Sequence, residues 1–155
     1  MPHVTLLYPF LPIERFDDGL ERLAFAASEL DPFTVELGTF RSFSHGASNT
    51  VWLAPTPTSE VVRLQTTLWR QFPGYDGTRS FKDGFTPHLS VGQVRGDRAC
   101  ENLLSALQES WAPITFTAER VSLIWRNAPP DDTFRVYRHF ELGSGRIVAP
   151  RDNEA

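Results

Sequence analysis

The sequence predicts an α/β (α+β) protein of two lobes, in which two antiparallel sheets flanked by helices are related by a pseudo-twofold axis about a central cleft. Two observations favour this fold class. Residues 2–6 and 87–91 share one pattern, which is proline, histidine, apolar, hydroxyl, apolar. Each copy is also followed by the same order of predicted elements, a helix and then two strands. A duplicated unit of this kind predicts that both motifs face one cleft.

The first half of the chain carries the first motif, one helix and two strands. Residues 2–6 are expected to form the motif strand. Apolar side chains at helical spacing predict a helix over residues 17–30. Alternation of polar and apolar residues predicts strands over residues 33–43 and 50–55.

The second half repeats this order after a link. An amphipathic helix is predicted over residues 59–72, and residues 74–85, rich in Gly, Asp and Ser, are expected to form a mobile loop. Beyond the second motif, the pattern predicts a helix over residues 97–111 and strands over residues 114–124 and 134–140.

These elements fit one domain. A chain of 155 residues with 41% hydrophobic content can bury one proper core. We expect a single bilobal domain over residues 1–142, with lobe 1 at about 1–57, the link at about 58–85 and lobe 2 at about 86–142. Residues 143–155 lack periodicity and are expected to be a mobile tail.

Composition excludes several classes of protein. The formal charge of −4 and the pI near 5.5 argue against a surface for long nucleic acids. No apolar run approaches the ~20 residues of a membrane span, and the start lacks a signal-peptide pattern. The single cysteine, Cys100, rules out an intramolecular disulfide and is expected to be buried in a helix. We therefore expect a cytoplasmic monomer without a membrane partner.

The two motifs place chemically useful groups together. Alternate side chains of a strand face the same side, so His3 with Thr5, and His88 with Ser90, each present an imidazole and a hydroxyl on one surface. An imidazole titrates at ~6.5, so one ring can serve as a base while another serves as an acid near neutral pH.

Other interpretations of the histidines are less favoured. A metal site lacks a HExxH motif, a cysteine cluster and an acidic residue beside either motif. A serine hydrolase built on Ser90 lacks the G-x-S-x-G turn. His45 is expected to be a solvated loop residue, and His139 a structural or edge residue. Independent origin of the two motifs, with His3 and His88 in core or surface roles, is the remaining alternative.

The two motifs, their wide separation and the repeated element order resemble the two-histidine (2H) phosphoesterases, in particular the 2′-5′ RNA ligase and cyclic phosphodiesterase-like branch. The resemblance covers roughly residues 2–142. It is strengthened by His-Val-Thr-Leu-Leu-Tyr-Pro-Phe at 3–10, by the proline-led strand at 32–38 and by Phe-Thr-Pro-His-Leu-Ser at 85–90.

The resemblance implies a site without metal or other cofactor. His3 and His88 would perform acid–base chemistry on a phosphodiester, and Thr5 and Ser90 would bind its non-bridging oxygens. The implied substrates are 2′,3′-cyclic phosphates or 2′-5′ linkages in a small nucleotide or an RNA terminus. Which histidine is the base stays open.

Further residues near the motifs are candidates for substrate binding. Tyr8 and Phe10 follow the first motif, and Trp125 and Arg126 end a predicted strand of lobe 2, so either set could stack on a base or bind phosphate. Core aromatics and a surface arginine are the equally open structural interpretation. A non-catalytic module that binds nucleotides or RNA ends is the alternative function, and turnover of a cyclic nucleotide distinguishes the two.

Overall fold

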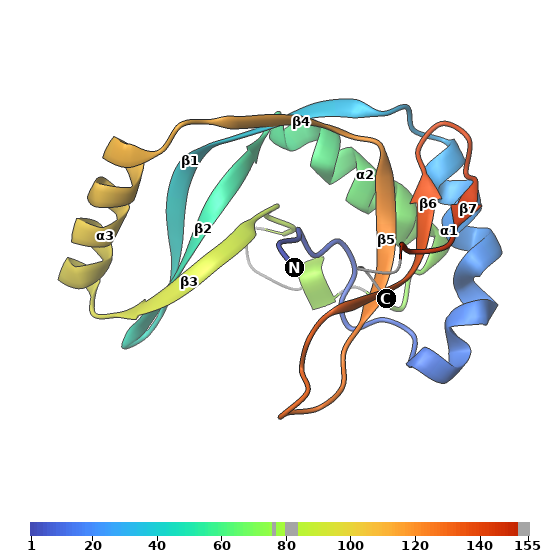
Figure 1. Ribbon diagram of the computed structural model, residues 1–155, viewed down its shortest axis with the longest axis horizontal. Helices are drawn as coiled ribbons and strands as arrows, with labels where there is room; N and C mark the ends of the chain where they lie inside the picture. Colours follow the sequence, from blue (N-terminus) through green and yellow to red (C-terminus); the bar gives the residue numbers. More distant parts are fainter. Residues whose placement is uncertain (76, 80–83, 152–155) are drawn as a thin grey trace.

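The computed structural model describes residues 1–75, 77–79 and 84–151 and confirms the predicted fold class (Figure 1). Among these residues, sheet A has the strand order β3-β2-β1-β4 and sheet B the order β5-β6-β7, with antiparallel pairing throughout. No helix in the described ranges is long and apolar enough to cross a bilayer. The α-helices are α1 (Leu20–Ser28), α2 (Thr58–Gln71) and α3 (Asp97–Ser110), and short 3₁₀ helices lie at η1 (Ile13–Gly19) and η2 (Gly77–Arg79). The strands are β1 (Phe33–His45), β2 (Ser48–Thr56), β3 (Leu89–Arg95), β4 (Ile114–Ala118), β5 (Arg120–Trp125), β6 (Arg135–Glu141) and β7 (Ile147–Val148).

The sheets do not follow the two halves of the sequence. Sheet A combines β1 and β2 with β3, which begins inside the second motif, and with β4, which follows that motif. The single strand expected over residues 114–124 is wrong, because the chain leaves sheet A at Glu119. Before that point β4 pairs with β1, and after it β5 pairs with β6. Figure 1 shows this crossing from one sheet to the other.

Two hydrophobic clusters hold the sheets and helices together. One fills the space between sheet A and α3 and contains the cysteine expected to be buried; its members are Val35, Leu37, Phe40, Val51, Leu53 and Cys100. The other joins α1 and α2 to sheet B; its members are Phe16, Leu23, Ala26, Ala27, Leu30, Leu64, Leu68, Phe72, Val121, Leu123, Phe140 and Leu142. Burial of apolar area in these clusters is the main stabilising term of the fold.

A β-bulge at Gly38 changes the faces of β1. The register with β2 shifts between Leu37 and Thr39. The Gln108 side chain satisfies the backbone there, because its Oε1 accepts from the Phe40 N–H at 3.0 Å and its Nε2 donates to the Gly38 carbonyl at 2.9 Å. Phe40 is therefore buried in the same cluster as Leu37, although it lies three positions further along the strand, where alternation would put it on the opposite face.

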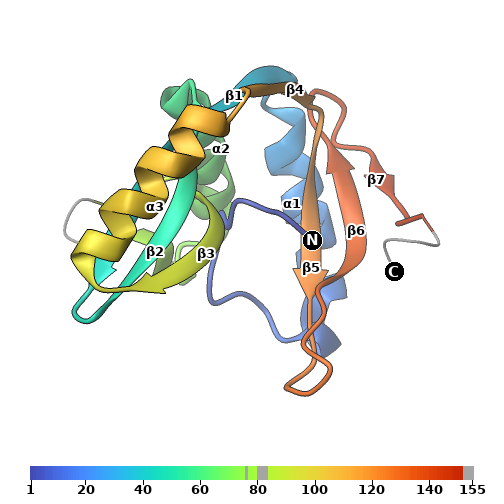
Figure 2. The same ribbon diagram turned by 60° about the vertical axis from the view of Figure 1, so that its left-hand side comes forward.

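The first motif does not form the expected strand. Its contact with a strand is a single antiparallel bridge between Val4 and Leu89. Just beyond it, the Leu6 carbonyl accepts from the Thr78 hydroxyl at 3.2 Å, a partner outside the sheet. In both views the N-terminal segment runs between the two sheets (Figures 1 and 2). The second motif is only partly in a strand, because β3 begins after His88.

The expected loop and tail contain regular structure. In the predicted loop, residues 77–79 form η2, while residues 76 and 80–83 lie outside the described residues. In the predicted tail, β7 pairs with β6, so this part of the chain is not wholly irregular. A tight turn precedes β7 at Gly145, where φ is +65° and a Cβ would lie 2.4 Å from the Ala24 carbonyl oxygen. Only glycine fits such a position.

Candidate active site

The two motif histidines are held in the same way. The His3 Nδ1 lies 3.0 Å from the Met1 carbonyl oxygen, and the His88 Nδ1 lies 2.9 Å from the Thr86 carbonyl oxygen. A carbonyl oxygen only accepts hydrogen bonds, so Nδ1 carries the proton in each ring. This leaves each Nε2 to accept or donate a proton. Both side chains are partly buried.

The Val4–Leu89 bridge brings the motifs side by side. Antiparallel pairing at this bridge places His3 across from Ser90, and Thr5 across from His88. Residues that flank a bridge point away from the bridged pair, so all four side chains emerge on one face. His3 and His88 are diagonal neighbours in such a pairing, and residues in that relation typically lie roughly 7–8 Å apart, with their Cβ atoms somewhat closer. Each histidine thus has two hydroxyl neighbours, one on its own segment and one across.

Aromatic rings fix both imidazoles. The His88 ring makes edge contacts with Phe43 and Trp52, at centroid distances of 5.0 and 5.9 Å, and these two rings stack on each other at 4.7 Å. The His3 ring makes an edge contact with Phe134 at 4.7 Å. These aromatic residues could not be predicted from the sequence, because alternation alone does not show which strand side chains reach the motifs.

Arg126 lies close to the first motif through an aromatic ring. Its guanidinium carbon is 4.8 Å from the centroid of Phe134, the same ring that contacts His3. Such a cation–π contact stabilises the position of an exposed arginine. Arg126, a candidate for substrate binding, and the motif residue His3 therefore both contact the Phe134 ring.

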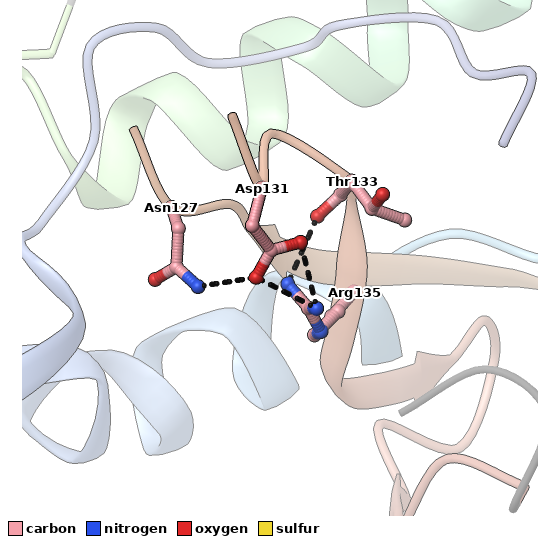
Figure 3. A network of polar contacts seen from close by, with 4 residues as sticks. All are labelled: Asn127, Asp131, Thr133 and Arg135. Carbon is pink, nitrogen blue, oxygen red and sulfur yellow. Dashed lines mark hydrogen bonds and ion pairs between the residues drawn. The ribbon is translucent and has the colours of Figure 1, made fainter. Parts of the chain in front are cut away.

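A polar network stabilises the connection between β5 and β6, which carries Arg126 and Phe134 (Figure 3). The Asp131 carboxylate accepts a hydrogen bond from the Asn127 amide at 2.8 Å. The Arg135 Nη2 lies 3.0 Å from each of the two Asp131 carboxylate oxygens and donates to them. Arg135 also donates to the Thr133 carbonyl. The hydrogen bond from Asn127, and next that from Arg135, hold the pKa of Asp131 below its usual range. The Arg135 guanidinium also lies 5.4 Å from the Trp125 centroid.

The two aromatic residues that follow the first motif, Tyr8 and Phe10, lie in different environments. Tyr8 is 68% exposed, whereas the Phe10 ring contacts Phe72 and Tyr75 at 5.0 and 5.3 Å. Gly77 packs against the segment between them, because a Cβ there would lie 2.3 Å from the Tyr8 carbonyl oxygen. Phe10 therefore belongs to the packed interior, and Tyr8 is free to meet a ligand. Trp125 is partly buried against the same cluster as Phe10.

The other two histidines stand apart from the motif pair. His45 is exposed at the end of β1. His139 is 3% exposed on β6, the central strand of sheet B, and its Nδ1 lies 2.8 Å from the Ser122 hydroxyl. The structure thus places His139 in the interior rather than at an edge.

A cavity of about 400 Å³ lies beside the first motif. His3 and Thr5 line it, but His88 and Ser90 do not, and most of its wall is apolar core from both sheets. The four motif side chains are therefore not gathered around this cavity. Within residues 1–75, 77–79 and 84–151, no three His, Cys, Asp or Glu side chains are grouped so that they could hold a metal ion.

The fold and the motifs define a class of protein, an α+β chain of two sheets that presents two histidine–hydroxyl pairs on one face. The chain belongs to the 2′-5′ RNA ligase superfamily, whose family model matches residues 1–130. It is 27% identical over 145 residues to proteins of Bacillus anthracis and Bacillus cereus that are provisionally named phosphoesterases, covering 93% of this chain and 80% of theirs. The crystal structure of TT0787 of Thermus thermophilus has the same fold, with a TM-score of 0.64, 18% identity, and coverage of 94% of this chain and 80% of that one.

Proposed function

We propose that this protein is a metal-independent phosphodiesterase that hydrolyses 2′,3′-cyclic phosphates or 2′-5′ linkages of nucleotides or RNA ends. The observation that carries the proposal is the matched presentation of His3 and His88, with Nδ1 of each ring bound to a carbonyl and Nε2 left for proton transfer. Membership of the 2′-5′ RNA ligase superfamily and the phosphoesterase names of the relatives support it.

In the proposed mechanism the phosphate sits between the two imidazoles. One neutral histidine accepts a proton from water as the water oxygen bonds to phosphorus. The other, protonated histidine donates its proton to the ribose oxygen as the bond from phosphorus to that oxygen breaks. A diagonal arrangement of His3 and His88, with residues typically roughly 7–8 Å apart, would leave room for a phosphate between the two imidazoles. The products are a phosphomonoester and a free hydroxyl when the substrate is a cyclic phosphate.

The hydroxyls would stabilise the charge that develops on the phosphate. The Val4–Leu89 bridge supports a position of Thr5 and Ser90 on the same face as the imidazoles, from which their hydroxyls would donate to the non-bridging oxygens. Such donors act most strongly where negative charge grows in the transition state. Among the four rim candidates, exposed Tyr8 and Arg126 are proposed to contact the nucleotide, while the packing of Phe10 and Trp125 favours a structural role.

The test is chromatographic analysis of 2′,3′-cyclic AMP and a 2′-5′-linked dinucleotide after incubation with the protein in EDTA. The proposal expects hydrolysis of at least one substrate by the wild type and none by His88→Ala. His45→Ala is the matched control, since this exposed histidine lies outside both motifs. Absence of product, together with a rise in melting temperature when a nucleoside phosphate is added, would contradict hydrolysis and favour the non-catalytic binding module.

A further inference from the structure

A row of paired residues extends the motif face across sheet A. Arg41 on β1 pairs with Trp52 on β2, and Trp52 pairs with Ser90 on β3. The Val4–Leu89 bridge continues the row from Ser90 to His3. Residues paired directly across antiparallel strands point to the same face, so the Arg41 side chain leaves the sheet on the face that carries both motifs.

The ring contacts of β1 and β2 support this placement independently. Phe43, two residues after Arg41, lies on the same face of β1 and touches the His88 ring at a centroid distance of 5.0 Å. Trp52 stacks on Phe43 and also contacts His88. Arg41 is thus on the side of β1 that meets the second motif, rather than on the side that packs against α3.

Arg41 carries a charge that none of the described residues neutralises. Its side chain is exposed, and it makes no hydrogen bond or ion pair within the described part of the chain. Arg15, Arg63 and Arg146, in contrast, each pair with a carboxylate on the surface.

Trp52 adds a second unsatisfied donor to the row. The residue is 5% exposed, and its indole N–H is buried without an acceptor among the described residues. A buried donor without a partner costs free energy unless an acceptor reaches it. The indole N–H lies inside the sheet face and is not accessible to a ligand, so the group that the face between Arg41 and Ser90 offers to an anion is the Arg41 guanidinium.

We propose that Arg41 binds a second phosphate of the substrate, one nucleotide position away from the reacting phosphate. This inference rests on the proposed function. Neighbouring strands are about 4.8 Å apart, so Arg41 starts roughly 10 Å from Ser90, and its long side chain can span part of that distance. A guanidinium binds phosphate through two parallel N–H donors. The favoured substrate is then an RNA end with at least one further phosphate rather than a mononucleoside cyclic phosphate.

Calorimetric titration with 3′-AMP and adenosine 3′,5′-bisphosphate tests the contact without requiring turnover. The wild type should bind the bisphosphate about tenfold more tightly, the effect expected of one charged hydrogen-bonded contact. Arg41→Ala should reduce the two affinities to the same value, and Arg41→Lys should restore part of the difference. Arg95→Ala is the matched control, because this exposed arginine on β3 is five residues, or about 17 Å, beyond Ser90.

Steady-state kinetics distinguish a failure of the Arg41 contact from a failure of the proposed hydrolysis. With a cyclic-phosphate-ended dinucleotide, Arg41→Ala should raise KM about tenfold and leave kcat nearly unchanged. Its kcat/KM for 2′,3′-cyclic AMP should equal that of the wild type. An equal loss with both substrates, or equal binding of both titration ligands to the wild type, would overturn the role of Arg41. Failure of hydrolysis with a retained preference for the bisphosphate would overturn the proposed reaction alone.

Discussion

At the scale of single residues, the backbone and the neighbouring rings determine how each motif histidine is presented. The carbonyl two residues before each imidazole fixes its tautomer, and an aromatic edge limits rotation of the ring. Fixed orientation matters because proton transfer requires short, aligned contacts in the transition state. The rings that hold His3 and His88 should therefore influence kcat without touching the phosphate.

Phe134→Leu tests this support for His3. The substitution removes the edge contact at 4.7 Å but retains an apolar side chain. Such aromatic contacts contribute about 0.5–1.5 kcal/mol, so we expect kcat to fall about three- to tenfold. Steady-state kinetics with the best cyclic-phosphate substrate provide the measurement. Phe25→Leu is the control, because Phe25 is 55% exposed on α1. Equal kcat values for Phe134→Leu and the wild type would show that ring support is unimportant.

Tyr8→Ala and Phe10→Ala should separate substrate contact from packing. Tyr8 is 68% exposed, so its removal should raise KM for a nucleotide several-fold and leave the melting temperature unchanged. Phe10 packs on Phe72 and Tyr75, so its removal should cost about 2–3 kcal/mol of unfolding free energy. Steady-state kinetics and urea unfolding of both variants measure these two effects. A stable Phe10→Ala protein with a raised KM would instead make Phe10 a binding residue.

At the scale of secondary structure elements, local irregularities decide which side chains reach the site. Strict alternation would put Arg41 and Phe43 on the same face as the buried Leu37. The bulge at Gly38 reverses the alternation and turns both toward the motifs. A second shift, between Val51 and Trp52, leaves Val91 unpaired and 46% exposed. Periodicity thus predicts the strands well, but it cannot locate bulges that depend on a distant side chain such as Gln108.

The connection between β5 and β6 should loosen in acid. Because bonds from Asn127 and Arg135 lower the pKa of Asp131 in the folded protein, the stabilisation by this carboxylate is complete above its unfolded value of ~3.9. It is lost as the pH falls through the folded-state pKa. Urea unfolding between pH 2 and pH 6 should show wild type more stable than Asp131→Asn, with the difference disappearing at the acid end. Asp132→Asn, at an exposed neighbouring position, should match the wild type throughout. A stability difference between wild type and Asp131→Asn that does not change with pH would show that the charge of Asp131 does not stabilise this connection.

At the scale of the whole molecule, strands from both sequence halves build the sheet that carries the second motif. The duplicated motif and element order predicted two antiparallel sheets, and the structure confirms these sheets. The pattern could not predict that β4 joins β1, nor that the first motif contributes one bridge instead of a strand. These features depend on long-range pairing, which local propensity does not encode. The meeting of the two motifs at the Val4–Leu89 bridge is therefore a result of tertiary structure.

In the proposed mechanism His3 and His88 act as one acid–base pair. The most direct measurement is the pH dependence of kcat/KM for 2′,3′-cyclic AMP with wild type, His3→Ala, His88→Ala and the double variant, all in EDTA. The wild type should give a bell-shaped profile, because one imidazole must be neutral and the other protonated. Each single variant should lose at least roughly a thousandfold in rate, and the double variant little more, since the two residues act together. Substantial turnover by either single variant would contradict the account.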